Sequence, residues 1–244
     1  MLHKTNGIVL RSVKYGDTSI ITTIFTDLFG VQTYMVQGVR SSKAKQKNSG
    51  FFQPGMLLEL VVYQQAQKNM QRIREFRAAY IYTGLQEDVV KNSISMFSVE
   101  LLLRLLPEQA PLPQLFDEAF KYFVALDKMS LQQVANFPLF FIIQCSKVLG
   151  YDLKSSYPGE LPGNNIQQAG FATHGASAMP FINDEDTGIL NLLLAADSYE
   201  AIEKIQMNAD RRLRLIDWYV AYLQQHTQHM GNLKSLSVLR AILH

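Results

Sequence analysis

Three sets of side chains have the residue types for catalysis or metal binding, and in each set the spacing favours a structural role. His174 and Ser177 lie close together, but Ser177 stands in GASAM, which lacks the second glycine of a nucleophile elbow. The acids 184–186 precede the apolar run GILNLLLAA and suit the start of a helix, where the helix dipole favours negative charge. His226 and His229 share a helix face without a further obvious ligand. We therefore predict that the chain is not an enzyme and has no catalytic residues, metal site or cofactor.

The one cysteine, Cys145, lies beside the most apolar run of the sequence, residues 137–143. A single cysteine excludes an internal disulfide and a cysteine-rich zinc site, and a buried thiol behaves as a small hydrophobic side chain. The apolar run is far shorter than the roughly 20 residues that span a bilayer. The N-terminus lacks the apolar core of a secretory signal, because Arg11 follows only four apolar residues. We expect a cytoplasmic protein with no membrane partner.

Charge is distributed unevenly along the chain. The 244 residues carry a formal net charge of +2, but residues 1–77 hold eleven Lys and Arg against four acids. This first part is therefore at +7 and the rest at −5. The composition, 48% hydrophobic and 18% charged, is that of a folded globular protein, so the asymmetry belongs to a structured surface. It predicts that the N-terminal part binds a polyanion.

The densest basic segment is 40–50, which has four cations and no acid among serine, asparagine and glycine. A segment of this kind can follow a phosphate backbone and release counterions from it, although many charged loops serve only solubility. The candidate phosphate contacts are Arg40, Lys43, Lys45 and Lys47.

Two cations in the last predicted strand strengthen this interpretation. Arg72 and Arg74 are two residues apart, so we expect them to project from one face of the sheet. Met70 and Phe76 have the same parity and are expected in line with them.

The first predicted strand adds Arg11 and Lys14, which are expected on opposite faces. Aromatic residues of the predicted strands are candidate stacking platforms, although an aromatic side chain in a small barrel is more often part of the core. They are Tyr15, Phe25, Tyr34 and Tyr63.

Three arginines, Arg211, Arg212 and Arg214, stand near the start of a predicted helix, where the helix dipole disfavours cations. One interpretation is a partner site for an acidic peptide or a phosphate. The other, which the sequence favours, is a salt bridge to Asp210 or Asp217 of the same helix. Trp218 in this helix is expected in the core.

The fold class that these patterns predict is α+β. Five runs rich in β-branched and aromatic residues, bordered by glycine and proline, predict strands at 7–15, 18–26, 31–39, 56–63 and 70–77. Five strands in about seventy residues fit a small closed barrel of the OB type, with an SH3-like barrel as the alternative.

After residue 80 the apolar period changes to that of helices. Helices are predicted at 93–106, with Ser93 as a cap, at 113–126, and at 137–150, ending at Gly150. A stretch dense in turn residues, 151–185, predicts an irregular excursion, and helices resume over 188–196, 198–205, 209–226 and 233–243. We therefore predict a nucleic-acid-binding barrel at 1–80 and a helical domain at 81–244.

The sequence also resembles the bacterial RecO family of recombination and repair proteins. The resemblance spans the chain and is strongest over the first eighty residues. It is carried by Gly7–Arg11, Tyr15–Asp17, Ile20–Ile21, Phe25–Thr26, Gly30, Gln37–Ser41 and Gln53–Pro54, and further along by Leu149–Tyr151 and Gly231–Ser235.

The resemblance implies an N-terminal OB-fold, a helical body and a role as a recombination mediator. Family members bind single- and double-stranded DNA, anneal complementary strands, and act with RecR, sometimes RecF, to load RecA onto DNA coated by single-stranded-DNA-binding protein. They can also bind the acidic C-terminal tail of that coating protein. Arg11, Arg40 and Ser41 stand in the matching segments and become candidate DNA contacts.

One departure from the family is clear. Many relatives carry a four-cysteine zinc module in the region corresponding to residues 151–185, and this stretch contains no cysteine. Zinc is therefore not expected here, and packing of Phe171, Met179 and Phe181 is expected to hold the excursion instead.

Two alternatives to a DNA-binding mediator remain open at this stage. One is a protein-interaction adaptor whose helical body binds partners while the barrel is only a docking module. The other is an enzyme, of which a metal-dependent nuclease is the first form to test.

Overall fold

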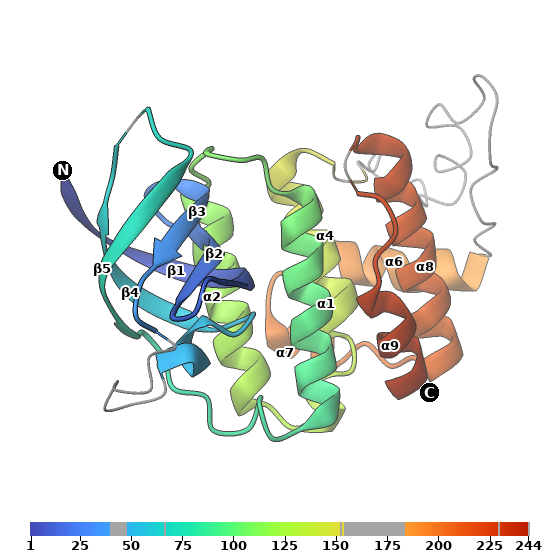
Figure 1. Ribbon diagram of the computed structural model, residues 1–244. Helices are drawn as coiled ribbons and strands as arrows, with labels where there is room; N and C mark the ends of the chain where they lie inside the picture. The colour runs from blue at the N-terminus through green and yellow to red at the C-terminus, as the bar shows by residue number, and fades with distance from the viewer. Residues whose placement is uncertain (40–47, 66, 152, 154–183, 229, 244) are drawn as a thin grey trace. The chain divides into compact units, whose positions relative to one another are not determined.

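The computed structural model describes residues 1–39, 48–65, 67–151, 153, 184–228 and 230–243 (Figure 1). The chain divides into two compact units, Met1–Lys128 and Met129–His244. The first unit contains all five strands and the helices α1 and α2, and the second contains the later helices. The division at residue 80 into a DNA-binding and a helical domain stays a prediction.

The five strands form a closed barrel. They are β1 (Leu2–Tyr15), β2 (Ser19–Thr26), β3 (Gly30–Val36), β4 (Leu57–Tyr63) and β5 (Met70–Ala78). Their order around the barrel is β1-β2-β3-β5-β4, with β1 also pairing with β4, and the β3–β5 pair alone is parallel. This Greek-key order confirms the OB-type barrel, and each strand was predicted to within a few residues except for the start of β1.

The long strand β1 belongs to both halves of the barrel. Its N-terminal part pairs with β4 and its C-terminal part with β2, and Gly7 pairs with both Thr26 and Leu58. A Cβ atom at Gly7 would lie 2.6 Å from Ile24 Cγ2 and 2.9 Å from Leu60 Cδ1. Only glycine therefore lets the strand pass this close to the barrel core.

The barrel core is a cluster of buried apolar side chains that face inward from all of β1 to β4 and from the segments before β4. They are Val9, Ile20, Ile24, Tyr34, Val36, Val39, Phe52, Met56, Leu58, Leu60 and Val62. A short 3-10 helix, η1 (Asn48–Phe52), contributes Phe52. The pairing of β1 with β2 shifts between Val9 and Arg11, so Leu10 is the extra residue of a β-bulge. Ile8, Val9 and Leu10 are all buried, at 0%, 0% and 1% exposure.

Two helices complete the first unit, α1 (Val89–Leu105) and α2 (Pro113–Lys128), which runs beside the barrel in Figure 1. The N-cap of α1 is Asp88, whose carboxylate accepts a hydrogen bond from the backbone N–H of Lys91 at 3.0 Å. The prediction of Ser93 as the cap is wrong, because Ser93 lies one turn inside the helix and donates to the carbonyl of Val89. An aspartate earlier in the chain satisfies the same free N–H groups.

The segment between the barrel and α1 is held by one buried carboxylate near the end of α2. Asp127, 3% exposed, accepts hydrogen bonds from the backbone N–H groups of Thr83, Gly84 and Leu85 at 2.7–3.1 Å, and from the hydroxyl of Tyr80 at 2.9 Å. Burial alone would raise the pKa of Asp127, but these donated hydrogen bonds outweigh it and lower the pKa to about 2. The charged carboxylate therefore fixes the path of the chain as it leaves the barrel.

The second unit is helical, as predicted for this part of the chain. Its helices are α3 (Leu131–Val134), α4 (Phe137–Leu149), α6 (Asp184–Ala195), α7 (Tyr199–Glu203), α8 (Ala209–His226) and α9 (Ser235–Ile242). Helix α4 ends at Gly150, which has a φ of 79°. Cys145 and Trp218 are buried, at 0% and 3% exposure, in agreement with their predicted place in the core. The short helix α3 was not predicted.

Candidate nucleic-acid interface

The predicted DNA contacts divide into those that the structure describes and those that it does not. The candidates of the basic segment, Arg40, Ser41, Lys43, Lys45 and Lys47, lie outside the described residues, as do most of the excursion 151–185 and the residues His174, Ser177 and His229. Arg11, Lys14, Arg72 and Arg74 lie in described strands, and their surroundings decide what each can bind.

The strand register places Arg11 and Arg72 on one outer surface of the barrel. Residues that pair across neighbouring strands form rows over this surface. One row crosses β1, β2, β3 and β5 and consists of Arg11–Thr23–Thr33–Met70. The neighbouring row crosses the same strands, continues onto β4 and consists of Val13–Ile21–Met35–Arg72–Tyr63. Three strand spacings and an offset of two residues separate Arg11 from Arg72, or about 16 Å along the curved sheet. Lys14 pairs with Ile20 of the core, so it lies on the other face of β1 from Arg11, as predicted.

Arg72 lies in a groove where β3, β5 and the loop between β4 and β5 meet. This basic groove, with a volume of about 490 Å³, is lined by Met35, Tyr63, Gln65, Lys68, Met70, Gln71 and Arg72. The set contains two cations and no acid. Within the described part of the chain, neither Lys68 nor Arg72 forms an ion pair, and the same is true of Arg11. Phosphate groups could therefore approach this surface without displacing an internal acid.

The loop that forms one wall of the basic groove is held by the side chain of Gln71. Gln71 is 4% exposed. Its Oε1 accepts from the backbone N–H of Gln65 at 2.9 Å, and its Nε2 donates to the carbonyls of Gln65 at 2.8 Å and Lys68 at 2.7 Å. A buried amide with its hydrogen-bonding groups used in this way holds the backbone of Gln65 and Lys68 in place before any ligand binds. Lys68 and the Gln71 link were not foreseen, although a lysine in the loop between the fourth and fifth strands of an OB barrel was a usable signal.

Arg74 does not share the environment of Arg72. The register of β4 and β5 shifts, with Val62 opposite Ile73 and Val61 opposite Glu75, so that Arg74 occupies a β-bulge. Its Nε lies 3.3 Å from Oε1 of Glu75. An adjacent acid partly neutralises Arg74, whereas Arg72 faces the basic groove.

The same bulge overturns the predicted alignment of Phe76 with the two arginines. Phe76 packs against the barrel core and makes an edge-to-face contact with Phe52, with ring centroids 4.8 Å apart. The alternation of the strand is reset at Arg74, so Ile73 and Phe76 both turn inward although they are three residues apart. Met70 lies in the groove beside Arg72, in agreement with the prediction.

Of the candidate stacking platforms, two are buried and two are exposed. Phe25 and Tyr34 are both 0% exposed and belong to the core, and burial raises the pKa of Tyr34. Tyr15 and Tyr63 are 51% and 42% exposed, and Tyr63 lines the basic groove.

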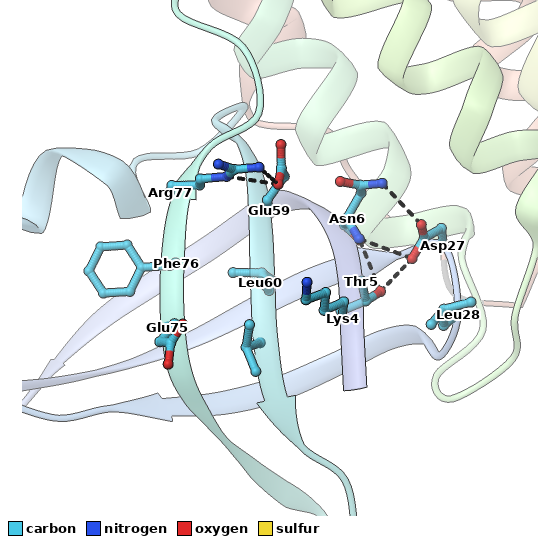
Figure 2. Close-up of a pocket in the computed structure, with 11 residues that line it drawn as sticks. Lys4, Thr5, Asn6, Asp27, Leu28, Glu59, Leu60, Glu75, Phe76 and Arg77 are labelled. Carbon is cyan, nitrogen blue, oxygen red and sulfur yellow. Dashed lines mark hydrogen bonds and ion pairs between the residues drawn. The ribbon is translucent and has the colours of Figure 1, made fainter. Parts of the chain in front are cut away.

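A second groove, of about 650 Å³, lies on the barrel surface formed by β4, the start of β1 and the end of β5 (Figure 2). This mixed-charge groove contains the acids Asp27, Glu59 and Glu75 with the cations Lys4 and Arg77. Arg77 binds Glu59, with its Nε at 2.8 Å from Oε2, and Figure 2 shows Asp27 bound to Thr5 and Asn6. The acids outnumber the cations, so this surface is a poor site for a polyanion.

The three arginines of α8 are bound within the second unit. Both Arg211 and Arg214 bind the buried carboxylate of Asp186, with Nε–O distances of 2.8 and 3.0 Å, and Arg211 also binds Glu185. The hydrogen bond to Asp186 raises the pKa of Arg214. Arg212 donates to Oδ1 of Asn136 at 2.8 Å, and its burial lowers its pKa.

Arg211 and Arg214 therefore form salt bridges, as the sequence favoured, but with other acids than predicted, and Arg212 binds Asn136 instead of an acid. The acidic partners come from the start of α6, about 25 positions earlier, rather than from Asp210 or Asp217 of the same helix. Asp217 instead binds Arg240. A partner-binding role for Arg211, Arg212 and Arg214 stays a prediction.

The described residues contain no group of three or more His, Cys, Asp or Glu side chains arranged to hold a metal ion. They also contain no helix that is long and apolar enough to cross a membrane. His226, one of the pair considered for metal binding, stacks on Tyr222 with ring centroids 4.3 Å apart.

Comparison with known proteins assigns the chain to a family. The family model described as "Recombination protein O N terminal" matches residues 1–82, and "Recombination protein O C terminal" matches residues 86–237. The chain is 31% identical to the DNA repair protein RecO of Bacteroides fragilis over 243 residues, which cover 99% of each chain. It is 27% identical to the DNA repair protein RecO of Christiangramia forsetii over 242 residues, again 99% of each chain. These matches extend over both the barrel and the helices, and the chain therefore belongs to the RecO family of recombination and DNA repair proteins.

Proposed function

We propose that this protein is a non-catalytic recombination mediator that binds single- and double-stranded DNA on its barrel and anneals complementary strands. In this role it would help to load RecA, together with RecR and in some settings RecF, onto DNA coated by single-stranded-DNA-binding protein. The C-terminal tail of that coating protein would be a further ligand. A cytoplasmic, nucleoid-associated location follows from this role.

The observation that carries the DNA-binding proposal is the basic groove and the surface beside it. Arg11, Lys68 and Arg72 face outward there, and within the described residues none of them is paired with an acid. Cations without internal partners retain their full attraction for phosphates, and binding them releases counterions from the DNA. The mixed-charge groove has more acids than cations and so attracts phosphates less. We therefore place the DNA path over the outer surface of β1, β2, β3 and β5.

The other predicted contacts extend this surface in the proposal. Arg40, Ser41, Lys43, Lys45 and Lys47 follow β3 in the sequence and would supply further phosphate contacts. Lys14 and Arg74 should contribute less to DNA binding, since Lys14 lies on the other face of β1 and Arg74 is beside Glu75.

The test is strand annealing by the full-length protein, with complementary oligonucleotides coated by single-stranded-DNA-binding protein and with the salt concentration varied. We compare the parent with a double variant, Arg11→Gln with Arg72→Gln. The matched control, Lys4→Gln with Arg77→Gln, removes the same charge from the mixed-charge groove.

We expect the parent to accelerate annealing, the first variant to lose most of this effect, and the control to resemble the parent. An equal loss of annealing activity in both variants would contradict the placement of the DNA over the basic groove. A parent that binds no DNA but recovers RecR or the coating protein from nuclease-treated extract would replace the proposal with the adaptor alternative.

A further inference from the structure

The basic groove has an exposed apolar floor as well as cations. Tyr63 and Met70 are 42% and 38% exposed, and Met35 lies beside them half-buried. The register places Arg72 directly between Tyr63 on β4 and Met35 on β3. Single exposed apolar residues are ordinary on protein surfaces, but here two of them and the half-buried Met35 line one groove around an arginine.

The groove offers the three kinds of contact that a nucleotide needs. An aromatic ring and polarizable methionine sulfurs can stack on the face of a base, and every base has such a face. Arg72 and Lys68 can bind the phosphates on either side. The amide of Gln65 can both donate to and accept from the edge of a base.

The groove is also formed in advance of binding. Gln71 holds the backbone of the loop at Gln65 and Lys68 through three hydrogen bonds of 2.7–2.9 Å. Backbone that is already held at Gln65 and Lys68 loses little further conformational entropy when a ligand binds there, so more of the contact energy appears as affinity.

We propose that Tyr63 is a stacking platform for one unpaired base of single-stranded DNA, with Arg72 and Lys68 binding the adjacent phosphates. This inference rests on the proposed function, because it names the part of the DNA that the basic groove takes. In duplex DNA the bases are stacked inside the helix and their faces cannot reach Tyr63. The groove therefore distinguishes single strands from duplex, which the cations alone do not.

The experiment measures binding of the full-length protein to an oligo-dT and to an abasic phosphodiester of equal length, which keeps the phosphates and lacks the bases. The variants are Tyr63→Leu, which removes the ring, and Tyr63→Phe, which keeps it. Tyr15→Leu is the matched control, because Tyr15 is an exposed tyrosine of the barrel that does not line the groove.

We expect the parent to prefer oligo-dT over the abasic strand by about 5- to 100-fold, the range expected for stacking of a base on an aromatic ring. Tyr63→Leu should lose most of this preference and keep its affinity for duplex DNA, while Tyr63→Phe and Tyr15→Leu should keep the preference. As a spectroscopic readout, oligo-dT should quench the tryptophan fluorescence of the Tyr63→Trp variant, and the abasic strand should not. The native Trp218 is 3% exposed, so it should contribute little to that signal.

A Tyr63→Leu variant that retains the full preference for bases would overturn the stacking proposal. If Arg72→Gln still weakened binding to both strands in that case, the DNA-binding function would stand without the base site. If the parent bound neither strand, the proposed function itself would fail.

Discussion

The sharpest difference that the structure draws is between two arginines of the same strand, Arg72 and Arg77. Arg72 faces the basic groove and, within the described residues, has no acidic partner, whereas Arg77 is bound to Glu59 in the mixed-charge groove. The perturbation is Arg72→Gln, which keeps a long polar side chain and removes one charge. Arg77→Gln removes the same charge from the other surface. We predict that only the first substitution strongly weakens binding to single-stranded DNA.

The size of the effect follows from counterion release. One phosphate contact contributes about 0.7 to the slope of log K against log salt concentration for single strands. Losing it should weaken binding about 8-fold at 50 mM salt and about 3-fold at 200 mM salt. For the control, screening limits a charge that contacts no phosphate to a range of about 10 Å at 0.1 M ionic strength. Its slope should therefore stay close to that of the parent.

The assay is fluorescence anisotropy with a labelled oligo-dT at four or more salt concentrations between 50 and 300 mM, with circular dichroism to show that the variants are folded. Equal slopes for the parent and Arg72→Gln would refute the assignment of a phosphate contact to Arg72. An equal loss of slope in Arg77→Gln would show that net charge, and not the position of the groove, governs binding. Arg74→Gln should fall between the two, because Arg74 is exposed but lies beside Glu75.

Three further predictions concern the elements that hold the interface in place. The Asp127 carboxylate has a pKa of about 2, below the 3.8 of a free carboxyl. It should therefore add about 2 kcal/mol to the free energy of unfolding above pH 4, and this stabilisation should be lost as the pH falls from about 4 to about 2. Asp127→Asn should lower the urea midpoint at pH 7 and remove that part of the pH dependence. At Gly30, with a φ of +67°, a Cβ would lie 2.1 Å from the carbonyl oxygen of Ala110. Gly30→Ala should therefore cost more stability than Gly16→Ala, which has a φ of +59° but open space and should lose only about 1–2 kcal/mol, and thermal unfolding compares the two. Gln71→Leu should free the loop between β4 and β5, which would appear as faster amide hydrogen exchange there and weaker oligo-dT binding, while a variant with unchanged exchange would exclude the proposed hold on the loop.

The barrel could be predicted from sequence because its strands show alternation and end at turn residues. The start of β1 was missed, since residues 2–6 are mostly polar and form the half of the strand that pairs with β4. The two bulges were missed for a different reason. Parity assigns a face only while the pairing is regular, and the extra residues Leu10 and Arg74 break it.

A signal for the second bulge was nevertheless present in the sequence. Ile73 and Phe76 are apolar side chains an odd number of positions apart in one strand, and regular alternation cannot place both in the core. Such spacing could have indicated that the face changes between Arg72 and Phe76. The partners of Arg211 and Arg214 offered no comparable signal, because Asp186 is distant in sequence and comes together with them only through the packing of α6 and α8.

The net charge of the barrel region is a weaker guide to its function than the pairing of its charges. Of its four acids, Glu59 and Glu75 bind Arg77 and Arg74, and Asp27 is bound to Thr5 and Asn6. Three of the acids are therefore bound on the side of the mixed-charge groove. Among the described residues, Arg11, Lys68 and Arg72 lie on the other side without an acidic partner. The bulge at Arg74 marks the boundary, since the strand contributes Arg72 to one groove before it and Glu75 and Arg77 to the other after it. A charge count predicts only that a polyanion binds, whereas the bulge separates the two grooves and so names the surface on which we propose that it binds.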